Sequence, residues 1–175
     1  MKFIISILAG ILFFVFPDFG SRLMMYYAIQ SVSRPHQTDA ELIARFQMKK
    51  PEFERVREMI ASDSKLERVD DNWTRPSDPS VIRVSSQRIA EYRKIFLDIG
   101  TPRGIEAYDL ARKSFSLIVS TQGLSVSGSA KGYLWSLVPP EPLFLELDSS
   151  LASPSRHFFG YRHLEGNWYL YLTLD

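Results

Sequence analysis

The first sixteen residues constrain this chain most. Lys2 is followed by a mainly apolar run from Phe3 to Phe16, which ends at Pro17. As a helix, this run would span about 21 Å at 1.5 Å per residue, which is shorter than a hydrocarbon core of about 30 Å. A short apolar run behind a basic residue is typical of a segment that directs export. We therefore predict that residues 1–20 are a signal peptide or a membrane anchor.

The fate of this leader stays open on sequence grounds. The segment Phe19-Gly20-Ser21 matches the small-residue pattern of a cleavage site poorly. A second apolar stretch, Leu23 to Ile29, either extends the anchor into the membrane interface, where tyrosine is favoured, or begins the folded domain. Basic residues flank the first run on both sides, so the positive-inside rule does not choose an orientation. We favour an extracytoplasmic domain, with residues 21–37 as a juxtamembrane segment or linker.

The composition limits the classes of partner that this chain is expected to bind. The chain has 21 basic and 20 acidic residues, for a formal net charge of +1, and no cysteine. A balanced charge lacks the basic footprint of nucleic-acid binding, and a chain without cysteine forms no disulfide. We predict a single domain over residues 38–175, which is long enough to bury a core. The predicted partners are the membrane, through residues 3–16, and a protein; nucleic acid is excluded.

Helix signals dominate the first half of this domain. Thr38 and Glu41 form a capping-box pattern, and Pro51 suits the first turn of a second helix. A third helix is predicted to begin at Ser85 or Ser86 and to end near Gly100. These signals predict three helices.

Strand signals dominate the second half. Alternating apolar residues follow Phe115, and Gln122-Gly123 offers a turn. Gly128 and Gly132 interrupt the next strand and indicate a bulge, a bend or a close helix contact. Residues 157–174 form a hairpin around Gly166-Asn167. We predict an α+β fold, with about three N-terminal helices packed on a C-terminal antiparallel sheet of four to five strands.

The register of this hairpin defines one candidate surface. A two-residue turn places Glu165 opposite Trp168 and His163 opposite Leu170. The predicted core face then carries Phe159, Tyr161, His163, Leu170, Leu172 and Leu174. The other face carries Arg162, Tyr169, Tyr171 and Thr173, which form either an aromatic and basic binding surface or an ordinary cross-strand ladder. A shift of one residue would exchange the two faces.

Catalytic and ligand candidates are few. His163 and Glu165 could act as an acid/base pair, with Tyr161 or Arg162 polarising a substrate, and the alternative is a structural histidine. The strand that carries Ser125, Ser127, Ser129 and Lys131 is expected to be exposed, which would keep the lysine protonated and the serines structural. His157 and His163 are about 20 Å apart along an extended strand, too far to share a metal. We predict no metal and no cofactor.

A loop around Trp73 is the second candidate surface. Asp70, Asp71 and Asp78 surround Trp73 and Arg75 in a proline-rich stretch. The acids lack the spacing of a calcium loop, and the tryptophan either plugs the core or contacts a partner. Tryptophan and arginine are the residue types that anchor interfaces, so Trp73 and Arg75 join Arg162, Tyr169 and Tyr171 as predicted partner-binding residues.

Several short motifs carry a resemblance. The segments Asp71-Asn72-Trp73-Thr74-Arg75-Pro76, Arg88-Ile89-Ala90-Glu91-Tyr92-Arg93, Pro102-Arg103-Gly104, Gly123-Leu124-Ser125-Val126-Ser127-Gly128-Ser129 and Tyr161-Arg162-His163-Leu164-Glu165-Gly166-Asn167-Trp168-Tyr169 resemble a group of small bacterial proteins with an N-terminal export segment. The resemblance covers most of the chain after the leader. No activity is known for that group, so it implies only a bacterial origin and one compact domain.

Three functions are compatible with these patterns. We favour a non-catalytic protein-binding or accessory module of the bacterial envelope, with an immunity-like role as one example. The first alternative is a small hydrolase that uses His163 and Glu165. The second alternative is a structural envelope protein that associates with itself through a sheet edge.

Overall fold

A computed structural model describes residues 35–109, 114–124, 127–152 and 157–174. The predicted leader and the apolar stretch Leu23 to Ile29 lie outside these ranges. Residues His36–Asp175 form one compact unit, which begins two residues before the predicted domain start. Among the described residues, no helix combines the length and the apolar character needed to cross a membrane.

The three predicted helices are confirmed. They are α3 (Asp39–Met48), α4 (Lys50–Ser62) and α5 (Ser86–Asp98). Thr38 and Glu41 make both hydrogen bonds of the capping box at α3, and the Ser85 hydroxyl accepts from the backbone N–H of Arg88 at the start of α5. Two short helical elements were not predicted, namely the 3₁₀ helix η1 (Pro79–Ile82) and α6 (Asp148–Ala152).

All strands of the described chain belong to one antiparallel sheet, so the α+β class is confirmed. The order is β2-β1-β3-β4-β5-β7-β6, and the bounds are β1 (Arg68–Val69), β2 (Thr74–Arg75), β3 (Ile105–Asp109), β4 (Ser114–Leu124), β5 (Ser127–Ser136), β6 (Phe158–Glu165) and β7 (Trp168–Leu174). The sheet has seven strands, so the predicted four to five was too low. Strands β1 and β2 have two residues each, which is too short for an alternating pattern to show.

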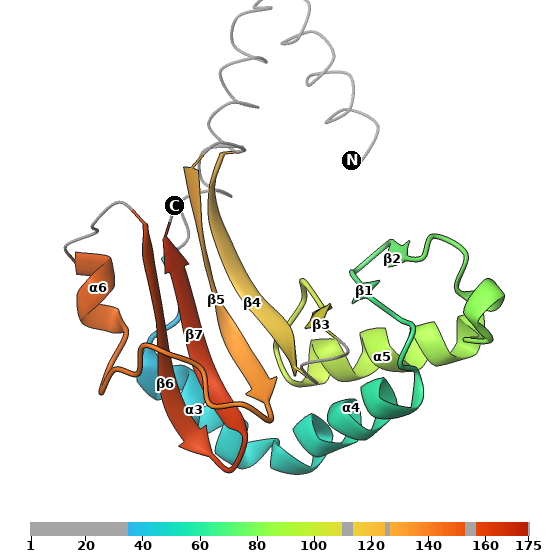
Figure 1. The fold of residues 1–175 in the computed structure, drawn as a ribbon, viewed down its shortest axis with the longest axis horizontal. Coiled ribbons are helices and arrows are strands. Elements are labelled where there is room, and N and C mark those ends of the chain that lie inside the picture. Colours follow the sequence, from blue (N-terminus) through green and yellow to red (C-terminus); the bar gives the residue numbers. More distant parts are fainter. Residues whose placement is uncertain (1–34, 110–113, 125–126, 153–156, 175) are drawn as a thin grey trace, which may run out of the picture. The chain divides into compact units, whose positions relative to one another are not determined.

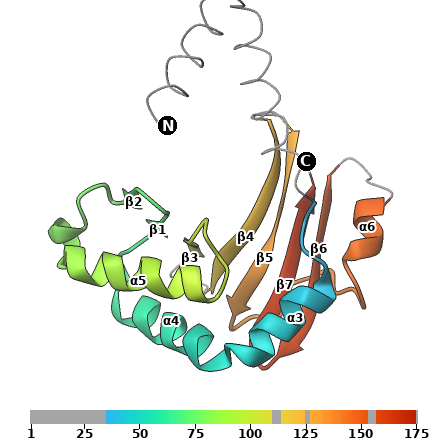
Figure 2. The same ribbon diagram turned by 180° about the vertical axis from the view of Figure 1, so that it is seen from behind.

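The main core lies between the helices and one face of the sheet. In Figure 2, α3, α4 and α5 lie on this side, which we call the helix side. An aromatic group fills this layer. Phe46 and Phe53 contact each other, and both contact Tyr133 and Trp168, at centroid distances of 4.6 to 6.3 Å. These side chains are almost fully buried. Burial of large aromatic side chains is the main force that holds the helices on the sheet.

The opposite face of the sheet, which we call the outer face, carries a smaller cluster. Leu134, Tyr169 and Tyr171 are its buried members, and Ala130 and Tyr161 pack against them. The chain that follows β5 passes in front of β7 and β6 in Figure 1. We call this stretch, residues 137–147, the crossover segment.

A bulge in β6 places the side chains of this strand on faces opposite to those predicted. Glu165 does pair with Trp168, as predicted, but the register shifts at Leu164, so that His163 pairs with Tyr169 and Arg162 with Leu170. Residues that pair directly across strands share a face. Arg162 therefore lies on the helix side with the leucines of β7, while Tyr169 and Tyr171 lie on the outer face. The predicted pairing of His163 with Leu170 was wrong, and so was the predicted placement of Arg162 on one face with Tyr169 and Tyr171.

A second bulge, in β4, confirms one prediction and overturns another. The register between β4 and β5 shifts at Val119, opposite Gly132, as the glycine had indicated. The turn predicted at Gln122-Gly123 was wrong, because these residues continue β4 and pair with Ser129 and Gly128. The connection between β4 and β5 falls at residues 125–126, outside the described ranges.

Candidate functional site

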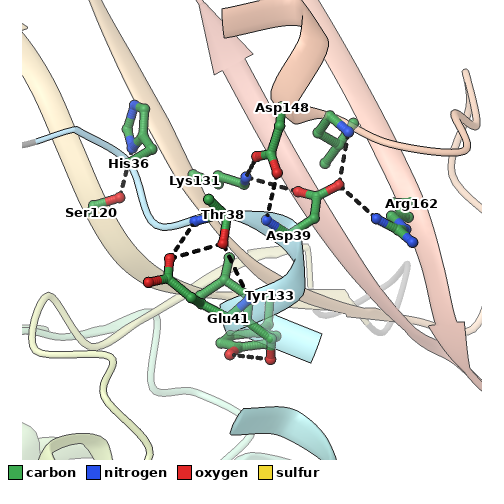
Figure 3. Close-up of polar contacts among 11 residues, drawn as sticks. His36, Thr38, Asp39, Glu41, Ser120, Lys131, Tyr133, Asp148 and Arg162 are labelled. Carbon is green, nitrogen blue, oxygen red and sulfur yellow. Dashed lines mark hydrogen bonds and ion pairs between the residues drawn. The ribbon is translucent and has the colours of Figure 1, made fainter. Parts of the chain in front are cut away.

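The first candidate site is a buried ionic cluster on the helix side of the sheet (Figure 3). Lys131 of β5 has no exposed side-chain surface, and its Nζ lies 2.7 Å from Asp39 Oδ1 and 2.5 Å from Asp148 Oδ1. The Asp39 side chain is 3 % exposed and also receives a bond of 3.0 Å from the Arg162 guanidinium. Two cations and two carboxylates balance, so the cluster has no net formal charge.

Backbone groups complete the cluster. The N–H of Leu147 donates to Asp39 Oδ2 at 2.8 Å, and the N–H of Asp39 donates to Asp148 Oδ2 at 2.9 Å. The cluster thus ties the first turn of α3 to β5, to β6 and to the start of α6. Burial alone would raise the pKa of Asp39, but the bonds from Lys131, Leu147 and Arg162 outweigh it and lower that pKa below its ordinary value.

His36 lies beside this cluster, immediately before α3. Its Nδ1 is 2.6 Å from Ser120 Oγ and its Nε2 is 2.6 Å from Ser129 Oγ. The histidine is 7 % exposed. Burial, reinforced by the charge of Lys131, lowers the pKa of His36 to about 4. The ring is therefore neutral at pH 7, with one nitrogen donating and the other accepting.

The cluster is a structural clasp, because each of its charges faces an opposite charge within the protein. This cluster was not predicted, because Lys131 was expected to be exposed on an open strand. The bulge at Val119 places Ser120 opposite Lys131, on the helix side. The acidic partners lie 92 residues before and 17 residues after the lysine in sequence. Local sequence patterns do not predict contacts between residues so far apart.

The second candidate site is a groove of about 550 Å³ on the outer face of the sheet. The crossover segment supplies one wall, with residues 138–141, and β4, β5, β6 and β7 supply the rest. Six side chains with hydroxyl groups line it: Ser114, Ser116, Ser136, Tyr161, Tyr171 and Thr173. Among the described residues that line the groove, Glu141 is the only charged one, and it is exposed.

Ser116 is the most unusual member of this lining. Its side chain is 1 % exposed, and Oγ has no hydrogen-bond partner among the described residues. A buried hydroxyl without a partner costs about 1–3 kcal/mol. A ligand atom in the groove would recover that cost.

The crossover segment itself is apolar and firmly held. Leu137, Val138, Leu143, Phe144 and Leu145 are all exposed, from 39 % for Phe144 to 93 % for Leu145. The segment is fixed to the edge of β6, because Phe144 N–H donates to the carbonyl of Tyr161 and Tyr161 N–H donates to the carbonyl of Pro142. Leu147 at its end is fully buried and bound to Asp39. The apolar side chains are therefore presented on an anchored backbone.

The predicted partner-binding residues do not form one surface. Trp73, which is 45 % exposed, and the exposed Arg75 lie at β2, whereas Arg162 lies in β6, and β2 and β6 are opposite edges of the sheet. The Arg68 guanidinium lies 5.3 Å from the Trp73 ring centroid, a cation-π contact. Trp73 does not plug the core, contrary to one of the two alternatives.

The other three predicted residues are divided between the two faces of the sheet. Arg162 binds Asp39 on the helix side. Tyr169 and Tyr171 are each 4 % exposed on the outer face, where Tyr171 lines the groove. Of the five predicted residues, Tyr171 is the one that contributes to the groove.

The predicted acid/base pair is engaged elsewhere. His163 Nε2 lies 2.9 Å from the carbonyl oxygen of Gly166, and Glu165 forms an ion pair with Lys50 of α4. The two side chains therefore have different partners. Two of the predicted acids of the Trp73 loop also have partners, since Asp70 pairs with Arg68 and Asp78 caps η1.

Within the described ranges, no group of three His, Cys, Asp or Glu side chains lies close enough together to hold a metal ion. Comparison with protein-family models, with curated proteins and with solved structures finds no match for this chain. The resemblance to small bacterial proteins therefore stays a prediction.

Proposed function

We propose that this chain is a non-catalytic accessory module of the bacterial envelope, exported or anchored by its N-terminus, that binds a protein partner through the crossover segment. The single observation that carries the proposal is the distribution of exposed apolar side chains. Of ten large apolar side chains exposed among the described residues, five lie between residues 137 and 145. Such a concentration on a soluble surface is typical of an interaction site.

The charges of the segment define the partner's chemistry. Residues 137–147 carry the exposed Glu141 and Glu146 and no basic residue. A complementary surface would be apolar with basic groups at its border, because charge complementarity steers association and fixes register. The segment is already fixed by backbone bonds, so binding would cost little additional ordering.

A matched pair of variants tests the proposal. The full-length protein, carrying a C-terminal tag, is captured from the source cells as wild type, as Leu145→Asp and as Leu97→Asp. Leu97 is 73 % exposed on α5 and serves as the control. We expect one stoichiometric partner that Leu145→Asp reduces about tenfold, as for removal of an interface anchor, and that Leu97→Asp retains. Equal capture by all three proteins would contradict the proposal.

Glu146→Lys tests the partner's charge in the same experiment. The change should weaken capture by about threefold to tenfold at low salt, and less at high salt, because exposed charges act mainly through screened long-range attraction. Stronger capture by Glu146→Lys would show that the partner surface is acidic.

The two alternatives lack a supporting observation of this kind. The crossover segment occupies both backbone groups of Tyr161 in β6, which hinders the pairing of another strand at that position of this edge. The hydrolase alternative needs His163 and Glu165 to act together, and their bonds direct them to different partners.

A further inference from the structure

We propose that the groove on the outer face binds a neutral saccharide chain. Of the exposed apolar side chains of the crossover segment, Val138 lines this groove, whereas Leu143 and Leu145, which are used to test protein docking, are not among its lining residues. The groove volume of about 550 Å³ lies within the range of about 300–1,000 Å³ that is usual for small-ligand sites. The class of ligand follows from the groups that line the groove.

The described part of the lining favours a neutral ligand over an anion. Among the described residues that line the groove there is no lysine, arginine or histidine, and Glu141 is the one charged group. Sites for phosphate or carboxylate groups are built from arginine, lysine or clustered backbone N–H groups. A neutral ligand fits this charge distribution.

The hydroxyl groups select a ligand that both donates and accepts hydrogen bonds. A serine or threonine hydroxyl has one donor and two acceptor sites, and six hydroxyl-bearing residues line the groove. Ser116 Oγ is buried there without a partner among the described residues. Saccharide hydroxyls have the same dual character, so they can satisfy such a lining.

Aromatic rings supply the apolar part of the site. Phe159 is 51 % exposed and contacts Tyr161 edge to face, at a centroid distance of 4.9 Å. The C–H face of a sugar ring packs against an aromatic face, while its hydroxyls remain at the rim. An aromatic ring next to hydroxyl groups can therefore bind both the apolar C–H face and the polar hydroxyl groups of a pyranose.

An extended peptide is the main competing ligand, and the backbone disfavours it. Peptides that bind sheets usually pair with a free strand edge. Strands β5 and β7 have neighbours on both sides, and the Tyr161 backbone of β6 is bound to the crossover segment. The groove offers side chains rather than a free edge.

The test uses the full-length protein in a detergent without a sugar headgroup. Chitotetraose and cellotetraose are the neutral probes, and tetragalacturonate is the acidic control; binding is followed by saturation-transfer NMR. We expect saturable binding of at least one neutral probe and about tenfold weaker binding of the acidic one, because Glu141 repels it.

Two variants and a control assign this binding to the groove. Phe159→Ala and Ser116→Ala should each weaken the binding of the neutral probe by about fivefold to tenfold. The control variant Leu97→Ala should leave this binding unchanged. Ser116→Ala should leave the melting temperature unchanged or raise it, because the free protein loses only an unpartnered hydroxyl. A purely structural Ser116 would lower stability without selectively affecting the probe.

The outcomes separate this proposal from the protein-docking proposal. Failure of both neutral probes to bind, with capture through Leu145 intact, overturns the saccharide site and leaves the protein partner. Binding that survives Phe159→Ala and Ser116→Ala, or equal binding of the acidic probe, also overturns it. Saccharide binding without any Leu145-dependent capture supports the groove and contradicts the docking surface.

Discussion

At the scale of single residues, Lys131 illustrates how a charge is tolerated in a core. Its ammonium group is fully buried between the carboxylates of Asp39 and Asp148. Removing one partner of a buried ion pair leaves an uncompensated charge, which typically costs about 3–5 kcal/mol. The clasp should therefore depend strongly on each partner's charge.

The first prediction concerns Asp39→Asn. Because Lys131 would keep only Asp148, the free energy of unfolding should fall by about 3 kcal/mol, measured by urea denaturation. Asp98→Asn is the control, since its pair with Lys49 is partly exposed and should contribute less than about 1 kcal/mol. Adding Lys131→Met to Asp39→Asn should recover part of the loss, and strictly additive effects would contradict the clasp.

The second prediction concerns pH and His36. The folded-state pKa is lowered from 6.5 to about 4, so between these values the unfolded chain binds a proton that the folded chain does not. The free energy of unfolding should therefore fall as the pH falls, by about 1.4 kcal/mol per pH unit from this group. Asp39 affects stability at a lower pH than His36 does. Because the folded-state pKa of Asp39 lies below its unfolded-state pKa, its contribution to stability is complete above the unfolded-state pKa and is lost as the pH falls through the folded-state pKa.

His36→Gln isolates the histidine contribution. The stability difference between wild type and His36→Gln should shrink as the pH falls from about 6.5 to 4, because only the wild type carries the histidine titration. Denaturation curves at several pH values measure this difference. A difference that stays constant over the window would show that His36 titrates alike in both states.

At the scale of elements, two bulges decide which side chains meet. The bulge at Val119 lies opposite Gly132, where an added Cβ would lie 2.1 Å from the carbonyl oxygen of Leu117. Backbone cannot yield as a flexible side chain does, so only glycine fits here. The bulge turns Ser120 toward His36, and the bulge at Leu164 turns Arg162 toward Asp39.

The third prediction is that Gly132→Ala disrupts this arrangement. The backbone clash should lower the free energy of unfolding by about 3 kcal/mol or more, as overpacking in a tight core does. Gly166→Ala is the matched control, because open space surrounds that position and only its φ of +57° opposes the change, at about 1–2 kcal/mol. Thermal unfolding compares the two variants, and an equal loss would show that the space at Gly132 is not limiting.

The same elements show what sequence can and cannot predict. Capping signals at Thr38 and Ser85 are local, so the helix starts were predicted. The hairpin turn at Gly166-Asn167 is also local, so the faces of β7 were predicted correctly. The bulge two residues before the turn, at Leu164, has no distinctive residue, and it reversed the predicted faces of β6. The clasp and the groove join side chains from separate strands and segments, and their formation depends on these registers.

At the scale of the whole molecule, the two faces of the sheet have different roles. The helix side holds the core and the clasp, which fixes α3, the end of the crossover segment and α6 to the sheet. The outer face holds the groove, and the crossover segment beside it exposes apolar side chains on a fixed backbone. This division suits the proposed binding role.

The most direct test of the binding role is a photocrosslinking scan in intact cells. A photoreactive amino acid is placed singly at Leu143, Leu145, Trp73 or Leu97 of the full-length protein, and adducts are identified by mass. The account predicts adducts to one partner at Leu143 and Leu145, and none to that partner at Trp73 or Leu97. Adducts to a partner at Trp73, with none at Leu143 or Leu145, would contradict it and place the interface at the opposite edge of the sheet.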